Sequence, residues 1–181
     1  MNFLIFNLGW MTFNVALAII AVIFGSLAFK TKNKFIKILA AIVWFFFLPN
    51  TIYLVTDVVN IPRDIGETSG IYLLITIFLY LILIPVGIIT FVLAERPFEK
   101  TFVKKGNYLP MYALNLFVAF GIVLGRVQRV NSWEVLTNIH NVIAESLRIL
   151  KSLELVVLVI IFAVFCQIIY LTLEKRVLKI E

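Results

Sequence analysis

Long apolar runs dominate this sequence and restrict what it can fold into. A transmembrane helix needs about 20 consecutive apolar residues to cross about 30 Å of hydrocarbon. Stretches of this kind occupy residues 10–29, 35–55, 71–93, 108–125 and 153–173. The hydrophobic fraction of 62% and the charged fraction of 14% do not fit a soluble domain of 181 residues, whose surface needs more charge. We therefore predict an all-α, polytopic membrane helical bundle in which residues 1–181 form a single integral membrane domain.

In residues 132–152, polar and apolar residues alternate with the period of a helix, unlike in the apolar runs. Glu134, Asn138 and Asn141 recur at helical spacing, and apolar residues occupy the opposite face. This pattern predicts an extracytoplasmic amphipathic helix, which lies in the plane of the membrane interface or across the mouth of the bundle. Ser132 is the predicted N-cap of this helix, and Glu134 in its first turn suits the positive end of the helix dipole.

The positive charges fall unequally on the two sides of the five predicted spans. One side holds eleven of the sixteen basic residues, namely Lys30, Lys32, Lys34, Lys37, Arg96, Lys100, Lys104, Lys105, Lys175, Arg176 and Lys179. The other side holds Arg63, Arg126, Arg129, Arg148 and Lys151. Because basic residues favour the cytoplasmic side, this bias predicts an N-terminus outside and a C-terminus in the cytoplasm.

Proline and glycine residues occur in the second span and in the connection that follows it. Pro49 lacks a backbone donor and should kink the span, and Asn50 is placed to satisfy backbone groups that the kink releases. Pro62, Gly66 and Gly70 predict that residues 57–70 form a short surface loop.

Two polar clusters interrupt the apolar pattern, and both fall on the predicted outer side. Asn50, Tyr53 and Asp57 share one face of a helix, at positions i, i+3 and i+7, with Thr56 beside them. The second cluster follows the fourth span and consists of Arg126, Arg129, Asn131, Ser132 and Trp133. Because they share a side of the membrane, we expect the two clusters to face each other.

Charge suggests how the clusters would interact. Charged groups at membrane depth are costly unless they are paired or hydrated, so Asp57 is expected to pair with Arg126 or Arg129. One interpretation is that this pair fastens two helix ends. The other is that the second guanidinium binds a phosphate or carboxylate. Tyr53 and Trp133 would then contact a ring or acyl chain of the ligand, or serve as ordinary interfacial anchors.

Small and amide side chains within the spans indicate helix packing. Gly121 and Gly125 form a GxxxG motif, which suits close packing either within the chain or between two copies of it. Asn14, Asn115 and Gln167 lie within apolar runs, where hydrogen bonds between helices would account for them.

The two polar clusters also carry a family resemblance. The motif Leu-Pro-Asn-x-x-Tyr-Leu-x-Thr-Asp at residues 48–57 and the motif Gly-x-x-Leu-Gly-Arg-x-x-Arg-x-Asn-Ser-Trp at residues 121–133 resemble the signature stretches of a bacterial membrane-protein family. That family is catalogued as domain of unknown function 1361 (DUF1361). The resemblance implies a multi-pass protein of the bacterial cytoplasmic membrane, and it implies no activity. Members often carry Asp where this sequence has Glu134, and an aromatic residue where it has Val123.

Few residues suit catalysis or metal binding. The sequence has one cysteine, Cys166, and one histidine, His140, which gives neither a disulfide framework nor a His-rich metal centre. We expect no catalytic residue, no metal and no cofactor. The absence of a basic stripe interleaved with aromatics argues against nucleic acid as a partner.

Three functions remain open at this stage. The first is a non-enzymatic protein whose outward polar site binds a lipid headgroup, a lipid-linked anion or a partner membrane protein. The second is a subunit for capture or transport of a small solute, and the third is a membrane enzyme that acts on lipid-linked substrates. The expected partners are membrane lipids, with another membrane protein or a second copy of the chain as further candidates.

Overall fold

The computed structural model describes residues 2–104 and 107–177, and their regular structure is helical apart from an isolated bridge between Lys104 and Asn107. Five helical segments in these residues are long and apolar enough to cross a membrane: Leu8–Lys30, Lys34–Gly66, Ile71–Phe102, Leu109–Arg126 and Leu153–Glu174. The predicted helical membrane bundle is therefore confirmed. Lys105 and Lys179, which enter the charge bias above, lie outside the described residues, as do the side chains of Lys175 and Arg176.

The chain separates into two compact units, Met1–Pro97 and Phe98–Glu181. The first unit contains α1 (Asn2–Lys30), α2 (Lys34–Phe47), α3 (Pro49–Thr56), the 3₁₀ helix η1 (Asp57–Asn60), α4 (Ile61–Gly66) and most of α5 (Ile71–Phe102). The second contains the end of α5, α6 (Leu109–Arg126), α7 (Glu134–Thr137), α8 (Ile139–Lys151) and α9 (Leu153–Val177). That residues 1–181 form a single domain stays a prediction.

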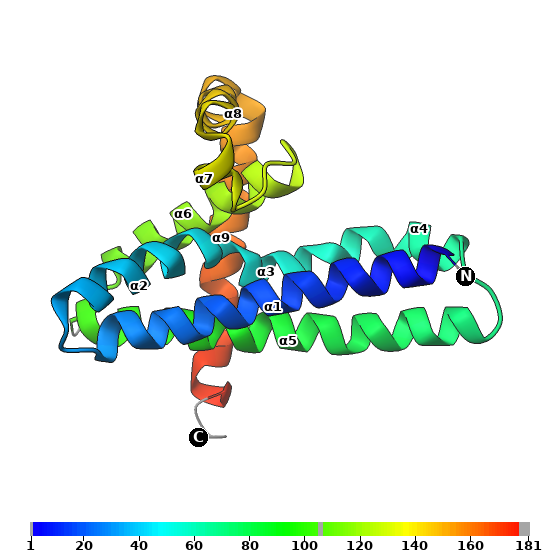
Figure 1. The fold of residues 1–181 in the computed structure, drawn as a ribbon, viewed down its shortest axis with the longest axis horizontal. Helices are drawn as coiled ribbons and strands as arrows, with labels where there is room; N and C mark the ends of the chain where they lie inside the picture. The colour runs from blue at the N-terminus through cyan, green and yellow to red at the C-terminus, as the bar shows by residue number, and fades with distance from the viewer. Residues whose placement is uncertain (1, 105–106, 178–181) are drawn as a thin grey trace. The chain divides into compact units, whose positions relative to one another are not determined.

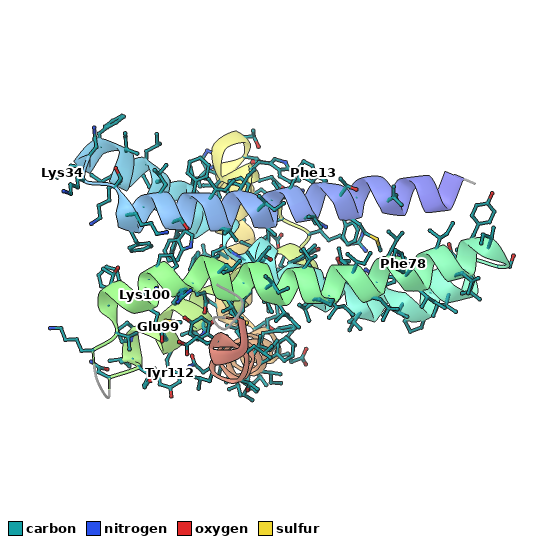
Figure 2. All side chains as sticks on the ribbon, turned by 90° about the horizontal axis from the view of Figure 1, so that it is seen from below. Phe13, Lys34, Phe78, Glu99, Lys100 and Tyr112 are labelled. Atoms are coloured by element: carbon teal, nitrogen blue, oxygen red, sulfur yellow. The ribbon has the colours of Figure 1, made fainter. Side chains whose placement is uncertain are left out.

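Within the first unit, three helical rods lie lengthwise side by side (Figure 1). They are α1, the succession of α2, α3, η1 and α4, and residues 71–97 of α5. Met11 and Ala18 of α1, Leu54 of α3 and Tyr80 and Leu83 of α5 form one buried cluster between them. Large apolar side chains, such as those of Phe13 and Phe78 (Figure 2), remain exposed, as expected for helices that face lipid.

The second span breaks where proline predicts it. Helix α2 ends at Phe47 and α3 begins at Pro49. The Asn50 side-chain amide donates to the Phe47 carbonyl at 3.2 Å, and the Thr51 hydroxyl donates to the Leu48 carbonyl at 2.7 Å. The prediction that Asn50 satisfies backbone groups at the kink is confirmed, and Thr51 shares this task. The break therefore leaves fewer backbone acceptors exposed to hydrocarbon.

The predicted surface loop at residues 57–70 is wrong over most of its length. η1 and α4 continue the helical path as far as Gly66, and Asp57 and Asp64 are both buried. Pro62 lies in the first turn of α4, where its missing N–H costs no hydrogen bond, so it begins a helix instead of ending one. The chain then reverses through Gly70, which has a left-handed φ of 58°.

Two glycines allow the rods of the first unit to approach closely. A Cβ atom on Gly25 would lie 2.7 Å from the Trp44 ring, whose Nε1 donates to the Ala94 carbonyl at 2.9 Å. A Cβ atom on Gly87 would lie 2.9 Å from the Leu54 Cβ and 3.1 Å from the Thr51 carbonyl oxygen. Side chains larger than hydrogen therefore do not fit at either position without displacing a neighbour.

In the second unit, α9 returns along α6. Ala119 and Val123 of α6 pack with Val159 of α9 and Ile149 of α8 in one buried cluster. The chain bends between α8 and α9 at Ser152, whose backbone is extended. As a result α8 lies crosswise to α9: Figure 1 shows α8 nearly end-on and α9 lengthwise.

The amphipathic segment begins later than predicted and is interrupted. α7 starts at Glu134 with Trp133 at the N-cap position, so the prediction of Ser132 as N-cap is wrong. Asn138, with φ −149° and ψ 61°, ends α7, and its side chain accepts from the Asn141 N–H to cap α8. Because an Asn side chain competes for nearby backbone donors, it favours a cap over a helix interior.

We predict that Gly87→Ala destabilises the protein by about 1–3 kcal/mol, the usual cost of overpacking a close contact. The added methyl group would meet a Cβ and a backbone carbonyl, neither of which can rotate away. Denaturation in detergent, followed by circular dichroism, measures the effect. Gly9→Ala is the matched control because nothing lies within 4 Å of a Cβ there. Equal stability of the two variants would contradict the prediction.

Candidate functional site

The first polar cluster lies at the end of α3, in the first unit. Asn50 and Tyr53 are half-buried, and the Thr56 hydroxyl donates to the Tyr53 carbonyl at 2.7 Å. Asn50 and Thr56 thus hydrogen-bond to the backbone of their own segment. Asp57, the first residue of η1, is 0% exposed. A buried carboxylate is costly unless its charge is compensated, so Asp57 is the residue of this cluster with the strongest electrostatic requirement.

A second buried carboxylate lies near Asp57, and the sequence analysis missed it. The Tyr80 hydroxyl of α5 donates to Asp64 Oδ2 at 2.6 Å, and Arg63 Nη2 donates to Asp64 Oδ1 at 3.0 Å. The Asp64 side chain is 2% exposed, whereas that of Arg63 is 59% exposed. The charge of Asp57 also acts on the Tyr80 hydroxyl. Two features of the sequence could have indicated this site: Tyr80 lies within an apolar span, and Arg63 and Asp64 are adjacent.

The second polar cluster forms the turn after α6, in the second unit. Arg126 is the last residue of α6 and is half-buried. Its positive charge lies at the helix C-terminus, where the helix dipole favours it. Arg129 has a left-handed φ of 58°, and the Val130 N–H donates back to the Leu124 carbonyl at 3.1 Å. These features reverse the chain sharply.

Glu134 organises this turn. Its Oε1 accepts from the Asn131 backbone N–H at 2.7 Å and from Asn131 Nδ2 at 3.0 Å, and its Oε2 accepts from Asn141 Nδ2 at 2.9 Å. These hydrogen bonds, led by that from the Asn131 backbone, lower the pKa of the Glu134 carboxyl below its ordinary value. The carboxylate therefore ties the turn to α8.

The side chains displayed by this turn differ in exposure. Arg129, Asn131 and Trp133 are exposed, and Ser132 is half-buried. An exposed guanidinium and an exposed indole thus stand four residues apart on a backbone held by Glu134. The two polar clusters belong to different units, so a contact of Asp57 with Arg126 or Arg129 stays a prediction.

The packing role of Gly121 and Gly125 also stays a prediction. Both glycines are half-buried on α6. Close approaches that exclude a side chain occur at Gly25 and Gly87, which have no GxxxG partner at helical spacing.

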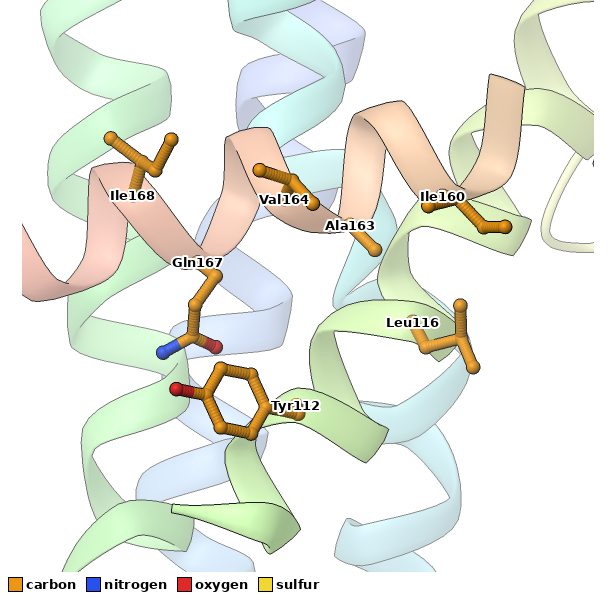
Figure 3. Close-up of a pocket in the computed structure, with 7 residues that line it drawn as sticks. All are labelled: Tyr112, Leu116, Ile160, Ala163, Val164, Gln167 and Ile168. Carbon is orange, nitrogen blue, oxygen red and sulfur yellow. The ribbon is translucent and has the colours of Figure 1, made fainter. Parts of the chain in front are cut away.

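Two amide side chains within the second unit form a buried pair. Asn115 Nδ2 donates to Gln167 Oε1 at 2.7 Å, which confirms a hydrogen bond between helices for these two. Near Gln167 an apolar cavity of about 360 Å³ opens between α6 and α9 (Figure 3). Asn14 Nδ2, in contrast, is buried without a hydrogen-bond partner among the described residues.

Metal ligands are not clustered in the part of the chain that the structure describes, where no group of three His, Cys, Asp or Glu side chains could hold an ion. Cys166 is a buried cysteine within α9. His140 is exposed near the start of α8. Neither residue lies among the polar groups of the two clusters.

The described residues contain five apolar helical segments of spanning length, and each unit buries polar side chains, which defines a multi-span helical membrane protein. The sequence model of a family described as "Protein of unknown function (DUF1361)" matches residues 13–170, and the chain belongs to this family. The resemblance carried by residues 48–57 and 121–133 is thereby confirmed. No curated protein and no solved structure matches the chain.

We predict that acid releases the turn that Glu134 holds. Its folded pKa is lowered, so its stabilisation is fully present above the ordinary value of 4.5 and is lost as the pH falls through the folded pKa. Hydrogen exchange of the Asn131 amide, compared with its intrinsic rate at each pH, should show protection that declines below about pH 4.5.

Glu134→Gln should remove this pH dependence. Glu145→Gln is the control, because Glu145 lies on α8 and pairs with Arg148 instead, at 3.6 Å. Protection of the Asn131 amide that survives in Glu134→Gln, with the same pH profile as the native chain, would contradict the assignment.

Proposed function

We propose that this chain is a non-enzymatic membrane protein that binds an anionic ligand of the membrane, a lipid headgroup or a lipid-linked phosphate, at the turn after α6. The observation that carries this proposal is the conformation of Arg129, which is exposed and left-handed on a turn tied down by Glu134. A left-handed backbone at a residue other than glycine costs about 1–3 kcal/mol and tends to persist at functional sites.

The side chains of the turn suit such a ligand chemically. A guanidinium presents a planar fork of donors that matches phosphate oxygens. Trp133 is 39% exposed and offers an apolar ring with a polar edge, which suits the boundary between headgroups and hydrocarbon. Because the turn is held before any ligand arrives, less conformational freedom is lost on binding.

In this proposal Asp57 compensates one of the two arginines. Its buried carboxylate would pair with Arg126 or Arg129 and leave the other guanidinium for the ligand. We further propose that both clusters face outward, with the N-terminus outside, in agreement with the distribution of Lys and Arg along the sequence. The membrane would then be the bacterial cytoplasmic membrane.

Charge reversal tests the pairing. Asp57→Arg alone and Arg126→Asp alone should each cost about 3–5 kcal/mol, because each leaves uncompensated charge in a buried site. The double variant should recover much of the folded, monodisperse protein extracted from membranes. If the double variant loses as much as the two single variants combined, Asp57 and Arg126 do not pair, and Arg129→Asp is the next partner to test.

Ligand binding is tested on the exposed residues of the turn. Arg129→Gln should weaken retention of phosphatidylglycerol or of a polyprenyl phosphate by about tenfold or more, because a hydrogen-bonded charge pair is lost. Native mass spectrometry of the detergent-solubilised chain measures the bound lipid. Lys32→Gln, an exposed lysine in the turn before α2, is the control. Unchanged retention in both Arg129→Gln and Arg126→Gln would overturn the proposal.

A subunit for capture or transport of a small solute is the second candidate. The interruption between α2 and α3 favours it, because broken helices often surround transported substrates. However, Asn50 and Thr51 already occupy the carbonyls of Phe47 and Leu48 at this break. Solute uptake into vesicles that contain the purified chain, or co-purification with a coupling subunit, would favour this candidate over lipid binding.

A further inference from the structure

The apolar face of α8 is exposed along its whole length. Ile139, Ile143, Leu147 and Leu150 recur at i, i+4, i+8 and i+11, and they are 44%, 51%, 48% and 63% exposed. Ile149 faces the other way and is buried against α6 and α9. α9 is long and apolar enough to cross a membrane, and α8 lies crosswise to it (Figure 1), an orientation that suits α8 to the membrane surface.

A second exposed apolar face follows α9, beyond the bend at Ser152. Leu153, Val157, Ile160, Val164 and Ile168 follow one face of this helix, and Leu153 is 79% exposed. Leu153 and Ile160 are separated by about 10 Å along the helix, at about 1.5 Å per residue. Ile160, Val164 and Ile168 then line the apolar cavity between α6 and α9 (Figure 3). The exposed apolar face of α9 therefore includes side chains that line this cavity.

A basic hollow lies beside the bend between α8 and α9. Ala144, Leu147, Arg148, Lys151 and Ser152 surround a cavity of about 510 Å³ at the C-terminal end of α8. These lining residues include two cations and no carboxylate. Glu145 lies 3.6 Å from Arg148 Nη1, yet the Arg148 side chain remains 69% exposed, so its guanidinium is accessible to another anion.

We propose that α8 and α9 together hold one anionic phospholipid, with its phosphate on Arg148 and Lys151 and an acyl chain along α9 toward the cavity beside Gln167. A soluble anion would contact only the two cations and would leave the apolar face of α9 without a ligand. A phospholipid matches both the charge of the hollow and the apolar surface beneath it. This site shares no residue with the turn after α6, so it stands independently of the function proposed there.

The test compares phosphatidylglycerol with phosphatidylcholine in nanodiscs or in native mass spectrometry of the full chain. The native chain should retain phosphatidylglycerol preferentially. Arg148→Gln combined with Lys151→Gln should reduce this preference by about 10- to 30-fold, since each cation near the surface contributes about a factor of five. Lys32→Gln combined with Lys34→Gln removes the same charge from another exposed segment and should leave most of the preference intact.

The acyl chain is tested separately. Ala163→Phe fills the cavity between α6 and α9 and should shorten lipid residence while leaving the headgroup preference in place. Size-exclusion chromatography checks that each variant is folded and monodisperse. If Ala163→Phe disrupts folding, Val164→Ala, which widens the cavity, replaces it and should also alter residence.

Three results would overturn this assignment. One is equal retention of the two lipids by the native chain. Another is the same loss in the Lys32 and Lys34 control, which would indicate general attraction by positive charge. The third is displacement of phosphatidylglycerol by millimolar inorganic phosphate, which would indicate a soluble-anion site. Because the turn after α6 is also proposed to bind phosphatidylglycerol, each α8 variant is combined with Arg129→Gln, so that lipid bound at that turn does not contribute to the retention measured at α8.

Discussion

The structure depends on the requirement that backbone polar groups find partners inside the membrane. Hydrocarbon offers no hydrogen bonds, so a break in a spanning helix must be closed by nearby side chains. The interruption at Leu48 shows how this chain meets the requirement, because Asn50 and Thr51 donate to the carbonyls that precede them. The second span can therefore change direction and still continue through η1 and α4 to Gly66.

The same requirement governs the carboxylates buried in the first unit. Asp64 accepts hydrogen bonds from Tyr80 and Arg63, and Arg63 reaches from the exposed side of α4. Asp57 and Glu95 are also fully buried. Such groups are retained at a cost in desolvation, and within membranes they commonly mark functional positions. The burial of Asp57, which ends the motif at residues 48–57, therefore marks the end of the second span as a candidate functional position.

In the second unit, single side chains hold a turn and a helix in place. Glu134 fixes the turn that displays Arg129 and Trp133, while Ile149 fixes α8 across the end of α9. Both devices keep cations beside apolar surface, which is the chemistry an anionic lipid requires. The two proposed sites therefore share one feature. In each, cationic side chains lie beside apolar side chains at the end of a helix.

The sequence by itself determined the spans, the break at Pro49, the capping by Asn50 and the amphipathic character of α8. Hydropathy, the missing proline donor and helical period are local properties, so they can be read from neighbouring residues. Only the tertiary structure decided that Asp64 is buried against Tyr80, that Gly87 contacts α3 and that Arg129 is left-handed. These features depend on residues distant in sequence, or on a turn whose Glu134 carboxylate also accepts a hydrogen bond from Asn141 of α8.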